Sequence, residues 1–448
     1  MDLRGKRVLV AGAGKTGIST ARFLLEKKAK VTVADSNINA VIPEDIKKSN
    51  ALIITGPHEN SLFTEQDLII MSPGIPLTIE PIAEARSNGV KIIGEIELAY
   101  IFTKTPIIAV TGTNGKTTTT TLLQHIFETA GKKVFTGGNI GTPLIEYVTG
   151  NQDADYIIAE ISSFQLETIN TFRPYISILL NITEDHLDRY DSFEDYAETK
   201  NNIFKNQKNS DVAIINIEDK LAAKMSENIK TDVLFFSTKN KLKNGSYYKD
   251  GFHFMKGSEK IRIDEEGIPL QGEHNRENIL AAVSAAGICN LSYENITKAL
   301  HTFKGLSHRM EFVDCINGIN FFDDSKATNV GACLKSISSI TPPIILIAGG
   351  KDKGGSYLPL TNEIKKNVRE IILIGEAQNR IKKELSATVP MTSTTTLEEA
   401  VTEAFSRAKK GCSILLSPAC SSFDMFESYI HRGNIFKTAV NKLRKSFS

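Results

Sequence analysis

A glycine-rich segment in the first third of the chain carries the residue types that hold a nucleotide triphosphate. Residues 110–120 read Val-Thr-Gly-Thr-Asn-Gly-Lys-Thr-Thr-Thr-Thr. The apolar run 106–110 leads into the glycines, and residues 121–127 follow with a helical pattern, which predicts a strand, a loop and a helix in that order. The N-terminus of a helix after such a loop presents backbone N–H groups and a favourable dipole to phosphate oxygens.

Two side chains of this segment add to the backbone groups. Lys116 supplies a positive charge for the β- and γ-phosphates, and the hydroxyl of Thr117 is a ligand for Mg²⁺. The common phosphate loop has a glycine where Val110 stands, whereas the first glycine here is Gly112. A Gly-Lys-Thr sequence in an ordinary surface turn is the alternative, but the strand before it and the helix after it favour a nucleotide triphosphate site.

A second glycine-rich turn lies near the start of the chain. Residues 12–17 read Gly-Ala-Gly-Lys-Thr-Gly between a predicted strand, 6–12, and a predicted helix, 18–27, and Asp35 ends the next predicted strand, 30–35. This spacing is typical of a dinucleotide site, and any other ligand with a diphosphate, including a nucleotide sugar, would use the same backbone N–H groups. A tight turn without a ligand is the third interpretation. Asp35 either accepts a hydrogen bond from a ribose hydroxyl or caps a turn.

Three polar residues follow the phosphate-loop segment in the same predicted sheet. Glu160 ends the strand 155–160, at the place where proteins with a phosphate loop hold Mg²⁺ with an acid; the alternative is an acid that caps a turn. His186 follows the strand 176–181 among acidic residues, so it is either a ligand that faces the same cleft or a surface residue. Lys200 lies in a helical pattern and is unremarkable by residue type alone.

The last third of the chain has three polar loops, each after a predicted strand. Residues 323–329 combine acids, an ammonium group and hydroxyls, residues 349–355 are rich in glycine with two lysines, and residues 417–424 contain serines. Because the carboxyl ends of parallel strands meet at one edge of a doubly wound sheet, we expect the three loops to converge. Lysines and hydroxyls there suit a small carboxylate ligand. Cys420 as a nucleophile is the alternative, and it lacks an evident partner histidine.

The alternation of strand and helix patterns predicts an α/β protein with three domains. A chain of 448 residues agrees with this number at roughly 150 residues per domain. We predict an N-terminal Rossmann-like domain at residues 1–94, a connector at 95–105, a central α/β domain of the phosphate-loop ATPase type at 106–303 and a C-terminal Rossmann-like domain at 304–448.

Two local patterns interrupt this alternation. Between residues 231 and 269 the apolar runs are short, and the dipeptides Asn244-Gly245 and Asp250-Gly251 predict hairpin turns. Residues 274–278 are polar, and we predict that they cap an alanine-rich helix at 279–289.

Composition excludes several classes of function. The chain is 41% hydrophobic and 23% charged with a net charge of +1, so it lacks the overall basicity that favours nucleic acids or membrane surfaces. Its five cysteines are scattered, which fits a reducing compartment and argues against a zinc site. We find no signal peptide and no run of the ~18 apolar residues that a membrane span needs. We therefore expect a cytoplasmic monomer with no nucleic-acid or membrane partner.

The residues alone favour an ATP-driven joining of two substrates. One predicted domain would hold ATP and metal, one a compound with a diphosphate, and one a carboxylate. A nicotinamide-dependent dehydrogenase is the main alternative; it uses residues 12–17 and Asp35 but leaves the phosphate-loop segment without a role. An ATP-driven switch or scaffold without enzymatic activity is a further alternative.

The sequence also resembles a known family over its full length. Residues 111–118, Thr-Gly-Thr-Asn-Gly-Lys-Thr-Thr, look like the ATP loop of the Mur ligases and of their folylpolyglutamate synthase relatives, which also lacks the early glycine. The folylpolyglutamate synthases usually have no UDP-binding domain ahead of this loop, whereas about 100 residues precede it here. The stretches that select the Mur ligases, and among them the members that add D-glutamate, are 137–141, 160–167, 181–190, 305–311, 324–329, and 416–426 with 432–433.

This resemblance implies an activity and its cofactors. It implies a ligase that uses ATP to add D-glutamate to UDP-N-acetylmuramoyl-L-alanine through an acyl phosphate, in the synthesis of peptidoglycan precursors. The implied cofactors are ATP and Mg²⁺ at two sites. The implied catalytic residues are Lys116, Glu160, His186 and Lys200. The implied metal ligands are Thr117, Glu160, His186 and Lys200, the last as a carbamate, which turns an ammonium into a carboxylate-like ligand.

The resemblance also assigns binding residues to each substrate. For ATP these are Gly112, Thr113, Asn114, Gly115, Lys116, Thr117, Thr118, Asn275, Asn278, Arg309 and Asp324. For the UDP-linked substrate they are Gly14, Lys15, Thr16, Asp35, Ser36, Asn37, Ser72 and Gly74, with Asn139 and Gln165 at its sugar-peptide part. For D-glutamate they are Lys326, Thr328, Lys353, Ser422 and Phe423. Lys351 is the alternative to Lys353, and Asn37 replaces an arginine of some relatives.

Overall fold

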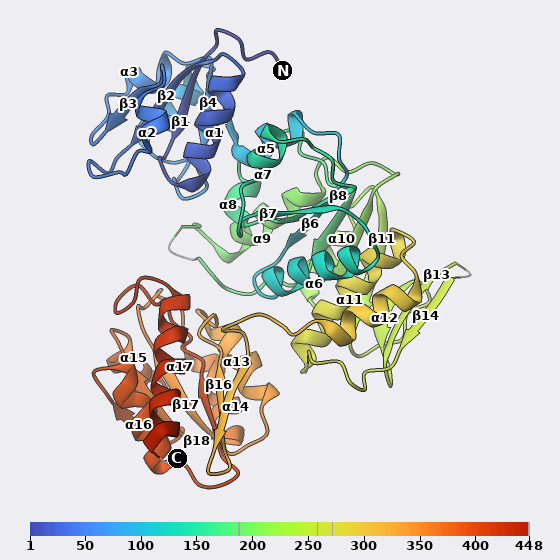
Figure 1. The fold of residues 1–448 in the computed structure, drawn as a ribbon, viewed down its shortest axis with the longest axis vertical. Helices are drawn as coiled ribbons and strands as arrows, with labels where there is room; N and C mark the ends of the chain where they lie inside the picture. Colours follow the sequence, from blue (N-terminus) through green and yellow to red (C-terminus); the bar gives the residue numbers. More distant parts are fainter. Residues whose placement is uncertain (187–188, 258, 271, 447–448) are drawn as a thin grey trace. The chain divides into compact units, whose positions relative to one another are not determined.

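The computed structural model describes residues 1–186, 189–257, 259–270 and 272–446, and within them the strands form three sheets (Figure 1). By packing, the chain forms two compact units. The first contains the N-terminal and central sheets, at Met1–Ile182, Glu194–Gly267 and Glu277–His301. The second contains the C-terminal sheet, at Thr302–Ser448, together with Thr183–Phe193 and Ile268–Arg276.

The N-terminal sheet consists of parallel strands in the order β3-β2-β1-β4-β5. Its strands read as short apolar runs because helices cover both faces. The strands are β1 (Arg7–Ala11), β2 (Lys30–Asp35), β3 (Leu52–Thr55), β4 (Leu68–Met71) and β5 (Lys91–Gly94), and the helices are α1 (Lys15–Glu26), α2 (Glu44–Lys47), α3 (Ser61–Thr64) and α4 (Glu80–Ser87). Because β1 lies between β2 and β4, the order in which the strands are added to the sheet reverses at β1, beside the first glycine-rich turn. Sheets of this kind bind ligands at such a point.

Helix α1 begins at Lys15, three residues before the predicted start. Gly14 is its N-cap with an extended backbone, so the first helical turn consists of the polar end of the glycine-rich turn. The helical spacing of apolar residues begins only at Ile18. A prediction based on that spacing therefore places the start of the helix too late.

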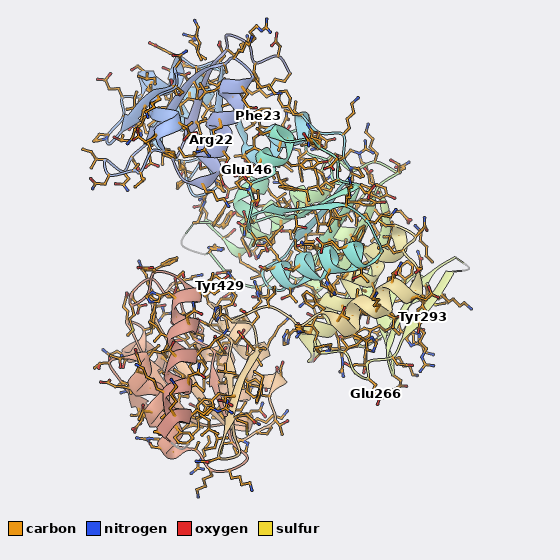
Figure 2. The ribbon with its side chains drawn as sticks, viewed as in Figure 1. Arg22, Phe23, Glu146, Glu266, Tyr293 and Tyr429 are labelled. Atoms are coloured by element: carbon orange, nitrogen blue, oxygen red, sulfur yellow. The ribbon has the colours of Figure 1, made fainter. Side chains whose placement is uncertain are left out.

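The predicted connector forms a buried helix, α5 (Glu95–Ile101). Glu97 is fully buried and accepts hydrogen bonds from the backbone N–H groups of Asn170, Thr171 and Phe172, between 2.8 and 3.0 Å long. The N-terminal part is also attached through α7 (Leu144–Thr149), where Glu146 accepts from the hydroxyl of Ser19 on α1 at 2.7 Å. Figure 2 labels Glu146 and, on α1, Arg22 and Phe23.

The central sheet has the order β14-β13-β12-β11-β10-β9-β6-β8-β7. Its strands are β6 (Ile107–Thr111), β7 (Val134–Gly138), β8 (Tyr156–Glu160), β9 (Ile176–Leu179), β10 (Val212–Asn216), β11 (Asp232–Ser237), β12 (Gly245–Tyr248), β13 (Phe252–Lys256) and β14 (Glu259–Ile263). Its helices are α6 (Lys116–Thr129), α8 (Ser163–Leu166), α9 (Phe193–Asn201), η1 (Asn202–Phe204), α10 (Lys220–Ser226), α11 (Glu273–Ile288) and α12 (Tyr293–Thr302). The strand–loop–helix order predicted around the phosphate loop is confirmed by β6 and α6.

Two local predictions for this part of the chain were wrong. The dipeptide Asn244-Gly245 makes no hairpin, because Gly245 starts β12 and β12 runs parallel to β11. Gly245 is needed there for another reason: a Cβ atom would lie 2.0 Å from the carbonyl oxygen of Phe235. The hairpin at Asp250-Gly251, between the antiparallel β12 and β13, is confirmed. Residues 274–278 do not cap the alanine-rich helix, since α11 already begins at Glu273.

The C-terminal sheet has the order β15-β16-β20-β17-β18-β19, and only β15 is antiparallel to its neighbour. The strands are β15 (Glu311–Ile316), β16 (Ile319–Asp323), β17 (Ile344–Gly349), β18 (Val368–Ile374), β19 (Met391–Ser393) and β20 (Ser413–Leu416). The helices are α13 (Val330–Ser339), η2 (Leu358–Leu360), α14 (Thr361–Asn367), α15 (Gln378–Leu385), α16 (Leu397–Arg407) and α17 (Tyr429–Ser446). One apolar core lies under α13, α14 and α15 and the other under α16 and α17, so both faces are covered (Figure 1).

The predicted α/β fold class is therefore confirmed, with a mixed rather than purely parallel sheet at the C-terminal end. Among the described residues, no helix has the length and apolar character that crossing a membrane requires.

Candidate functional site

The phosphate loop joins β6 to α6 through two glycines with positive φ, Gly112 at +147° and Gly115 at +85°. A Cβ atom on Gly115 would lie 2.3 Å from Oδ1 of Asn278, so the loop leaves no room for a side chain there. The same Oδ1 accepts a hydrogen bond from the hydroxyl of Thr119 at 3.2 Å. The structure thus brings Asn278 of α11 to the loop, and Asn275 lies one helical turn before it, also buried.

Lys116 lies over this loop. Its Nζ atom donates to the carbonyl oxygens of Gly112 and Thr113 at 2.8 and 2.9 Å. Asn181, at the end of β9, holds the other side of the loop through Asn114, accepting from its N–H at 2.8 Å and donating to its carbonyl oxygen at 3.1 Å. Sequence reasoning included Asn181 in the family-specific stretch 181–190 but gave it no role. It is a positioning residue for the loop.

Glu160 ends β8 with its side chain buried. Its Oε1 accepts a hydrogen bond from the amide of Asn139 at 2.8 Å, while Oε2 is buried and has no hydrogen-bond partner among the described residues. A buried carboxylate oxygen without a partner is costly, and a bound cation would satisfy it. Asn139, predicted at the sugar-peptide part of a substrate, therefore orients Glu160 in this structure.

Lys200 is almost completely buried, at 1% exposure, on α9. Its Nζ atom donates to the carbonyl oxygen of Gly112 at 3.0 Å and lies 4.6 Å from the centre of the Tyr196 ring. The structure thus brings Lys200, Lys116 and the phosphate loop together, although Lys200 is separated from the loop by more than 80 residues in the sequence. Thr117 and Glu160 belong to the same compact unit, and His186 belongs to the other.

At the first glycine-rich turn, Asp35 acts as a cap. Its two carboxylate oxygens accept from the backbone N–H groups of Ala13 at 2.7 Å and Asn37 at 2.9 Å. Of the two roles considered for Asp35, the cap is the one observed. Gly17 is required by packing, because a Cβ atom would lie 1.8 Å from the carbonyl oxygen of Gly12.

The other residues predicted to bind the UDP-linked substrate differ in their exposure. Gly14, Lys15, Ser36, Asn37 and Gly74 are exposed, Thr16 and Ser72 are half-buried, and Gln165 is buried. Lys15 donates from Nζ to the carbonyl oxygen of Gly141 at 2.7 Å. The Gln165 Oε1 atom accepts from the N–H of Ser162 at 3.0 Å, so that end of its amide completes a capping box for α8.

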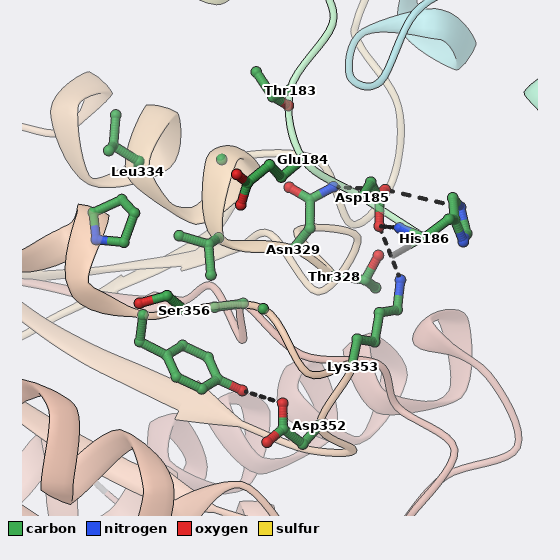
Figure 3. Close-up of a pocket in the computed structure, with 16 residues that line it drawn as sticks. Thr183, Glu184, Asp185, His186, Thr328, Asn329, Leu334, Asp352, Lys353 and Ser356 are labelled. Atoms are coloured by element: carbon green, nitrogen blue, oxygen red, sulfur yellow. Dashed lines mark hydrogen bonds and ion pairs between the residues drawn. The ribbon is translucent and has the colours of Figure 1, made fainter. Parts of the chain in front are cut away.

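The second unit contains a pocket of about 270 Å³ (Figure 3). Asp185 lies at its polar end, where its carboxylate is 3.6 Å from Nζ of Lys353 and 3.9 Å from Nε2 of His186, and accepts from the amide of Asn329 at 3.2 Å. Thr328 also lines the polar end. The remaining lining combines the polar side chains of Thr183, Glu184, Asp352 and Ser356 with the largely apolar ones of Val330, Leu334, Tyr357, Pro359 and Ala419.

Of the two lysines of the glycine-rich 349–355 loop, only Lys353 lines this pocket; Lys351 is exposed and pairs through its backbone with Ser421. The three other residues predicted for D-glutamate are not part of the pocket lining. Lys326 has its Nζ atom 3.9 Å from the centre of the Tyr429 ring, Ser422 is buried, and Phe423 is 69% exposed.

Asp324 is buried, and burial raises its pKa to about 7, against the opposing effects of the Ser336 hydroxyl, the Met310 N–H and the charge of Arg309. Asp324 accepts from the N–H of Met310, the neighbour of Arg309 in the chain, at 3.2 Å, and the joint role of Asp324 and Arg309 at ATP stays a prediction. Cys420 is buried as well, and burial raises the pKa of its thiol to about 11, against a hydrogen bond from Tyr357. At neutral pH the thiol stays protonated, which argues against Cys420 as a nucleophile.

Arg432 is a residue whose role sequence reasoning missed. It is completely buried and donates to the hydroxyl and carbonyl oxygens of Ser325 at 2.9 and 2.7 Å and to the carbonyl oxygen of Cys420 at 3.2 Å. It therefore joins two of the three polar loops at the edge of the C-terminal sheet. Its presence in the stretch 432–433 was a signal, but only the fold shows what it holds.

Comparison with known proteins identifies the family. A family model described as the N-terminal domain of MurD-like Mur ligases matches residues 6–94, one described as the Mur ligase middle domain matches residues 110–286, and one described as the Mur ligase glutamate ligase domain matches residues 308–420. This chain belongs to the Mur ligase family.

Two relatives show how much of the chain is shared. A UDP-N-acetylmuramoylalanine–D-glutamate ligase of Geotalea daltonii is 45% identical, covering 99% of each chain. An enzyme of the same name from a Thermoanaerobacter species is 44% identical, covering 99% of this chain and all of that one.

Solved structures share the fold. A pseudomurein peptide ligase type C from Methanothermus fervidus has a TM-score of 0.61 at 20% identity, over 98% of this chain and 100% of that one. A MurF ligase from Thermotoga maritima in complex with ADP has a TM-score of 0.60 at 16% identity, over 98% of this chain and 96% of that one.

Proposed function

We propose that this protein is the ATP-dependent ligase that adds D-glutamate to UDP-N-acetylmuramoyl-L-alanine during cytoplasmic synthesis of peptidoglycan precursors, acting as a monomer. The observation that carries the proposal is the identity of 45% along the full chain with an enzyme named for this reaction. The phosphate loop, the partnerless oxygen of Glu160 and the pocket beside Lys353 support it, because the reaction needs a nucleotide site, a metal ligand and a carboxylate site.

The chemistry proceeds in two steps. The carboxylate of the terminal alanine attacks the γ-phosphorus of ATP, the bond to the β-γ bridging oxygen breaks, and ADP leaves as the acyl phosphate forms. The amine of D-glutamate then attacks the acyl carbon, and the tetrahedral intermediate expels phosphate and loses a proton to give the amide. Lys116 stabilises the charge that develops on the phosphoryl group in the first step.

The residues of the first unit fit a divalent cation. Mg²⁺ prefers oxygen ligands, and the buried Oε2 of Glu160 has no other partner among the described groups. The proposed ligands in this unit are Glu160, Thr117 and a carbamate on Lys200; the resemblance also implies His186, a residue of the second unit, and a second ion. When bound, the ions neutralise charge on the phosphates. Asn139 keeps the Glu160 carboxylate turned so that one oxygen remains available.

The lining of the pocket in the second unit carries both charges, the Lys353 ammonium and the carboxylates of Glu184, Asp185 and Asp352, so it suits a small zwitterionic amino acid. A volume of about 270 Å³ lies just below the range of drug-sized ligand sites, which suits a molecule of the size of glutamate. The ammonium of Lys353 and the hydroxyl of Thr328 at its polar end are suitable partners for a carboxylate. We propose Lys353 rather than Lys351 as the contact, together with Thr328; the resemblance also implies Lys326, Ser422 and Phe423, which do not line this pocket.

The direct test measures phosphate release with ATP, Mg²⁺, UDP-N-acetylmuramoyl-L-alanine and a panel of amino acids. We expect release with D-glutamate and none with L-glutamate, L-alanine, L-lysine or diaminopimelate. Release with another amino acid, or none with D-glutamate, would refute the proposed specificity. Binding of NAD(H) without binding of UDP would favour the dehydrogenase alternative instead.

A second test addresses Lys200. We expect Lys200→Ala to lose ligase activity, because the variant has no amine to carbamylate, and we expect added short carboxylic acids to restore part of it. Lys133→Ala, which removes an exposed lysine with an ion pair to Asp153, is the control and should remain fully active. Full activity of Lys200→Ala would remove this lysine from the proposed metal site.

A further inference from the structure

The segment 352–357, which carries Lys353 into the pocket of the second unit, is attached to helix α15 by two residues, Arg380 and Glu384. Arg380 donates from Nη1 to Asp352 Oδ2 at 2.6 Å, and from Nη2 to the carbonyl oxygens of Gly354 at 3.0 Å and Gly355 at 2.6 Å. Its guanidinium carbon also lies 5.4 Å from the centre of the Tyr357 ring. A single planar guanidinium therefore contacts both sides of Lys353 along the chain.

Glu384, one turn further along α15, fixes the guanidinium and the far end of the segment. Its Oε1 accepts from Nε of Arg380 at 2.9 Å. Its Oε2 accepts from the N–H of Tyr357 at 2.7 Å and from the hydroxyl of Ser356 at 3.1 Å. Arg380 and Glu384 do not line the pocket, but Asp352, Gly355, Ser356 and Tyr357 do.

We propose that Arg380 is a positioning residue for the amino-acid pocket, which it serves by holding the 352–357 segment so that the Lys353 ammonium stays at the polar end. The identity of the bound amino acid, D-glutamate, rests on the proposed function. The contacts of Arg380 are independent of that function, since all of them join residues of one compact unit.

Two physical effects give Arg380 this role. The segment needs restraint, because Gly354 has a φ of +82° and the glycines beside Lys353 make the unfastened loop flexible. The segment also contains a competing charge: Asp352 is adjacent to Lys353 in sequence. Arg380 neutralises Asp352, so that the Lys353 ammonium pairs with Asp185 across the pocket, 3.6 Å away, instead of with its own neighbour.

The number of donors matters as well as the charge. Arginine presents five N–H groups in a rigid fork, and three acceptors of this segment, together with Glu384, use that fork. A lysine offers one compact ammonium group and can satisfy only part of this set. The conservative variant Arg380→Lys is therefore expected to restore the charge effect but not the full restraint.

The test compares Arg380→Ala, Arg380→Lys and Glu384→Gln with the wild type in the phosphate-release assay. For Arg380→Ala we expect the KM for D-glutamate to rise about tenfold or more, with the KM for ATP unchanged and kcat within about threefold. Arg380→Lys and Glu384→Gln should lie between Arg380→Ala and the wild type. Hydrogen exchange of the backbone amides of residues 352–357, without substrates, should become faster in the same order.

Arg407, the last residue of α16, provides a matched control in the same unit. It is similarly exposed, at 37% for its side chain against 32% for Arg380, and pairs with the two carboxylates of Glu370 and Glu403, neither of which lines the pocket. Arg407→Ala should lower the melting temperature as much as Arg380→Ala without changing the KM for D-glutamate. Equal KM changes in both variants would reduce Arg380 to a stabilising residue and overturn the proposal.

Different results would contradict the proposed function and the positioning role of Arg380. A wild-type protein that releases no phosphate with D-glutamate contradicts the proposed function, and the exchange measurement then still tests whether Arg380 holds the segment. Unchanged exchange and unchanged KM in an active Arg380→Ala contradict only the positioning role. If Arg380→Ala does not fold, Arg380→Lys and Glu384→Gln decide, and wild-type values in both overturn the proposal.

Discussion

The two glycine-rich turns of the first unit have similar sequences and different surroundings. Both follow a parallel strand and precede a helix, α1 in one case and α6 in the other. At the first turn a lysine, Lys15, bonds away from its own loop, to the carbonyl oxygen of Gly141. At the second turn Lys116 bonds back onto its own loop, to the carbonyl oxygens of Gly112 and Thr113.

The difference lies in which distant residues meet each turn. The first turn receives Asp35, a carboxylate whose two oxygens accept backbone N–H groups. The second turn receives two amides, those of Asn181 and Asn278, and the Lys200 amine that we propose to be carbamylated. A turn that holds the Lys116 ammonium and is surrounded by amides suits a highly charged polyphosphate, whereas a turn capped by an acid suits a ligand of lower charge with hydroxyl groups. We therefore propose different ligands for the two turns.

The largest effect is expected from replacing the lysine of each turn by alanine. Lys116→Ala should lower kcat for phosphate release about 10³-fold, because Lys116 stabilises charge on the transferred phosphoryl group. Lys15→Ala should leave kcat within about threefold and act on the KM for the UDP-linked substrate. Steady-state kinetics of both variants make the comparison.

The lysine comparison also has a clear contrary outcome. A drop in kcat as large for Lys15→Ala as for Lys116→Ala would show that both turns contribute to phosphoryl transfer. Nucleotide binding by Lys116→Ala, measured by calorimetry with ADP, separates a loss of catalysis from a loss of binding.

A smaller effect is expected from adding one methyl group to each turn. Gly115→Ala places a Cβ atom at 2.3 Å from Asn278 Oδ1 in a residue with φ of +85°, so we expect a loss of about 1–3 kcal/mol in the free energy of unfolding. Gly14→Ala has φ of −68° and no heavy atom within 4 Å, so its change should stay within about 0.5 kcal/mol.

Denaturant unfolding of the two glycine variants measures this contrast. The effect of Gly115→Ala should be reduced in the double variant with Asn278→Ala, since that substitution removes the atom in conflict. An equal loss of stability for Gly14→Ala would mean that the first turn is as closely packed as the second.

The smallest effect concerns Glu95, which follows β5 and accepts from the N–H of Ile145 at 2.6 Å, in the region between the two turns. Burial raises the pKa of Glu95 to about 7, against the effect of that hydrogen bond. The pKa of this carboxyl group is 4.5 in the unfolded state. Between pH 4.5 and 7 the folded state therefore still binds a proton that the unfolded state has released. The folded state consequently loses stability as pH rises from 4.5 to 7, and the loss persists above pH 7.

Glu95→Gln keeps the acceptor for Ile145 and removes the titration. We expect the variant to match the wild type in stability near pH 4.5 and to exceed it by on the order of 1–3 kcal/mol at pH 8, measured by thermal unfolding across this range. Glu26→Gln, which changes an exposed acid at the end of α1, is the control and should show no such rise. A constant difference between Glu95→Gln and the wild type at all pH values would contradict the raised pKa.

Much of the fold could be predicted from local patterns. Buried parallel strands read as apolar runs, so the strands predicted at 106–110, 155–160 and 176–181 agree with β6, β8 and β9 within a residue or two. Predictions failed where a local pattern had two meanings. Asn244-Gly245 is typical of a hairpin turn, but here Gly245 is a glycine that a parallel neighbour approaches closely. Residues 274–278 resemble a cap, but α11 already begins at Glu273, so they form part of the helix.

The sequence by itself determined the three α/β parts, the two glycine-rich turns, the polar loops of the C-terminal sheet and the resemblance to the Mur ligases. Each of these depends on residues that are neighbours in the chain or on a regular spacing, which a sequence displays directly.

The tertiary structure alone decided which groups are already satisfied and which are available. It gave Asp35 to backbone caps, left one oxygen of Glu160 without a partner among the described groups, and placed Lys353 rather than Lys351 in a pocket. It also gave roles to Arg432 and Arg380, whose hydrogen bonds reach loops far away in the sequence. The physical reason is that hydrogen bonding and burial depend on groups brought together only when the chain folds, and residue type and spacing do not specify those partners.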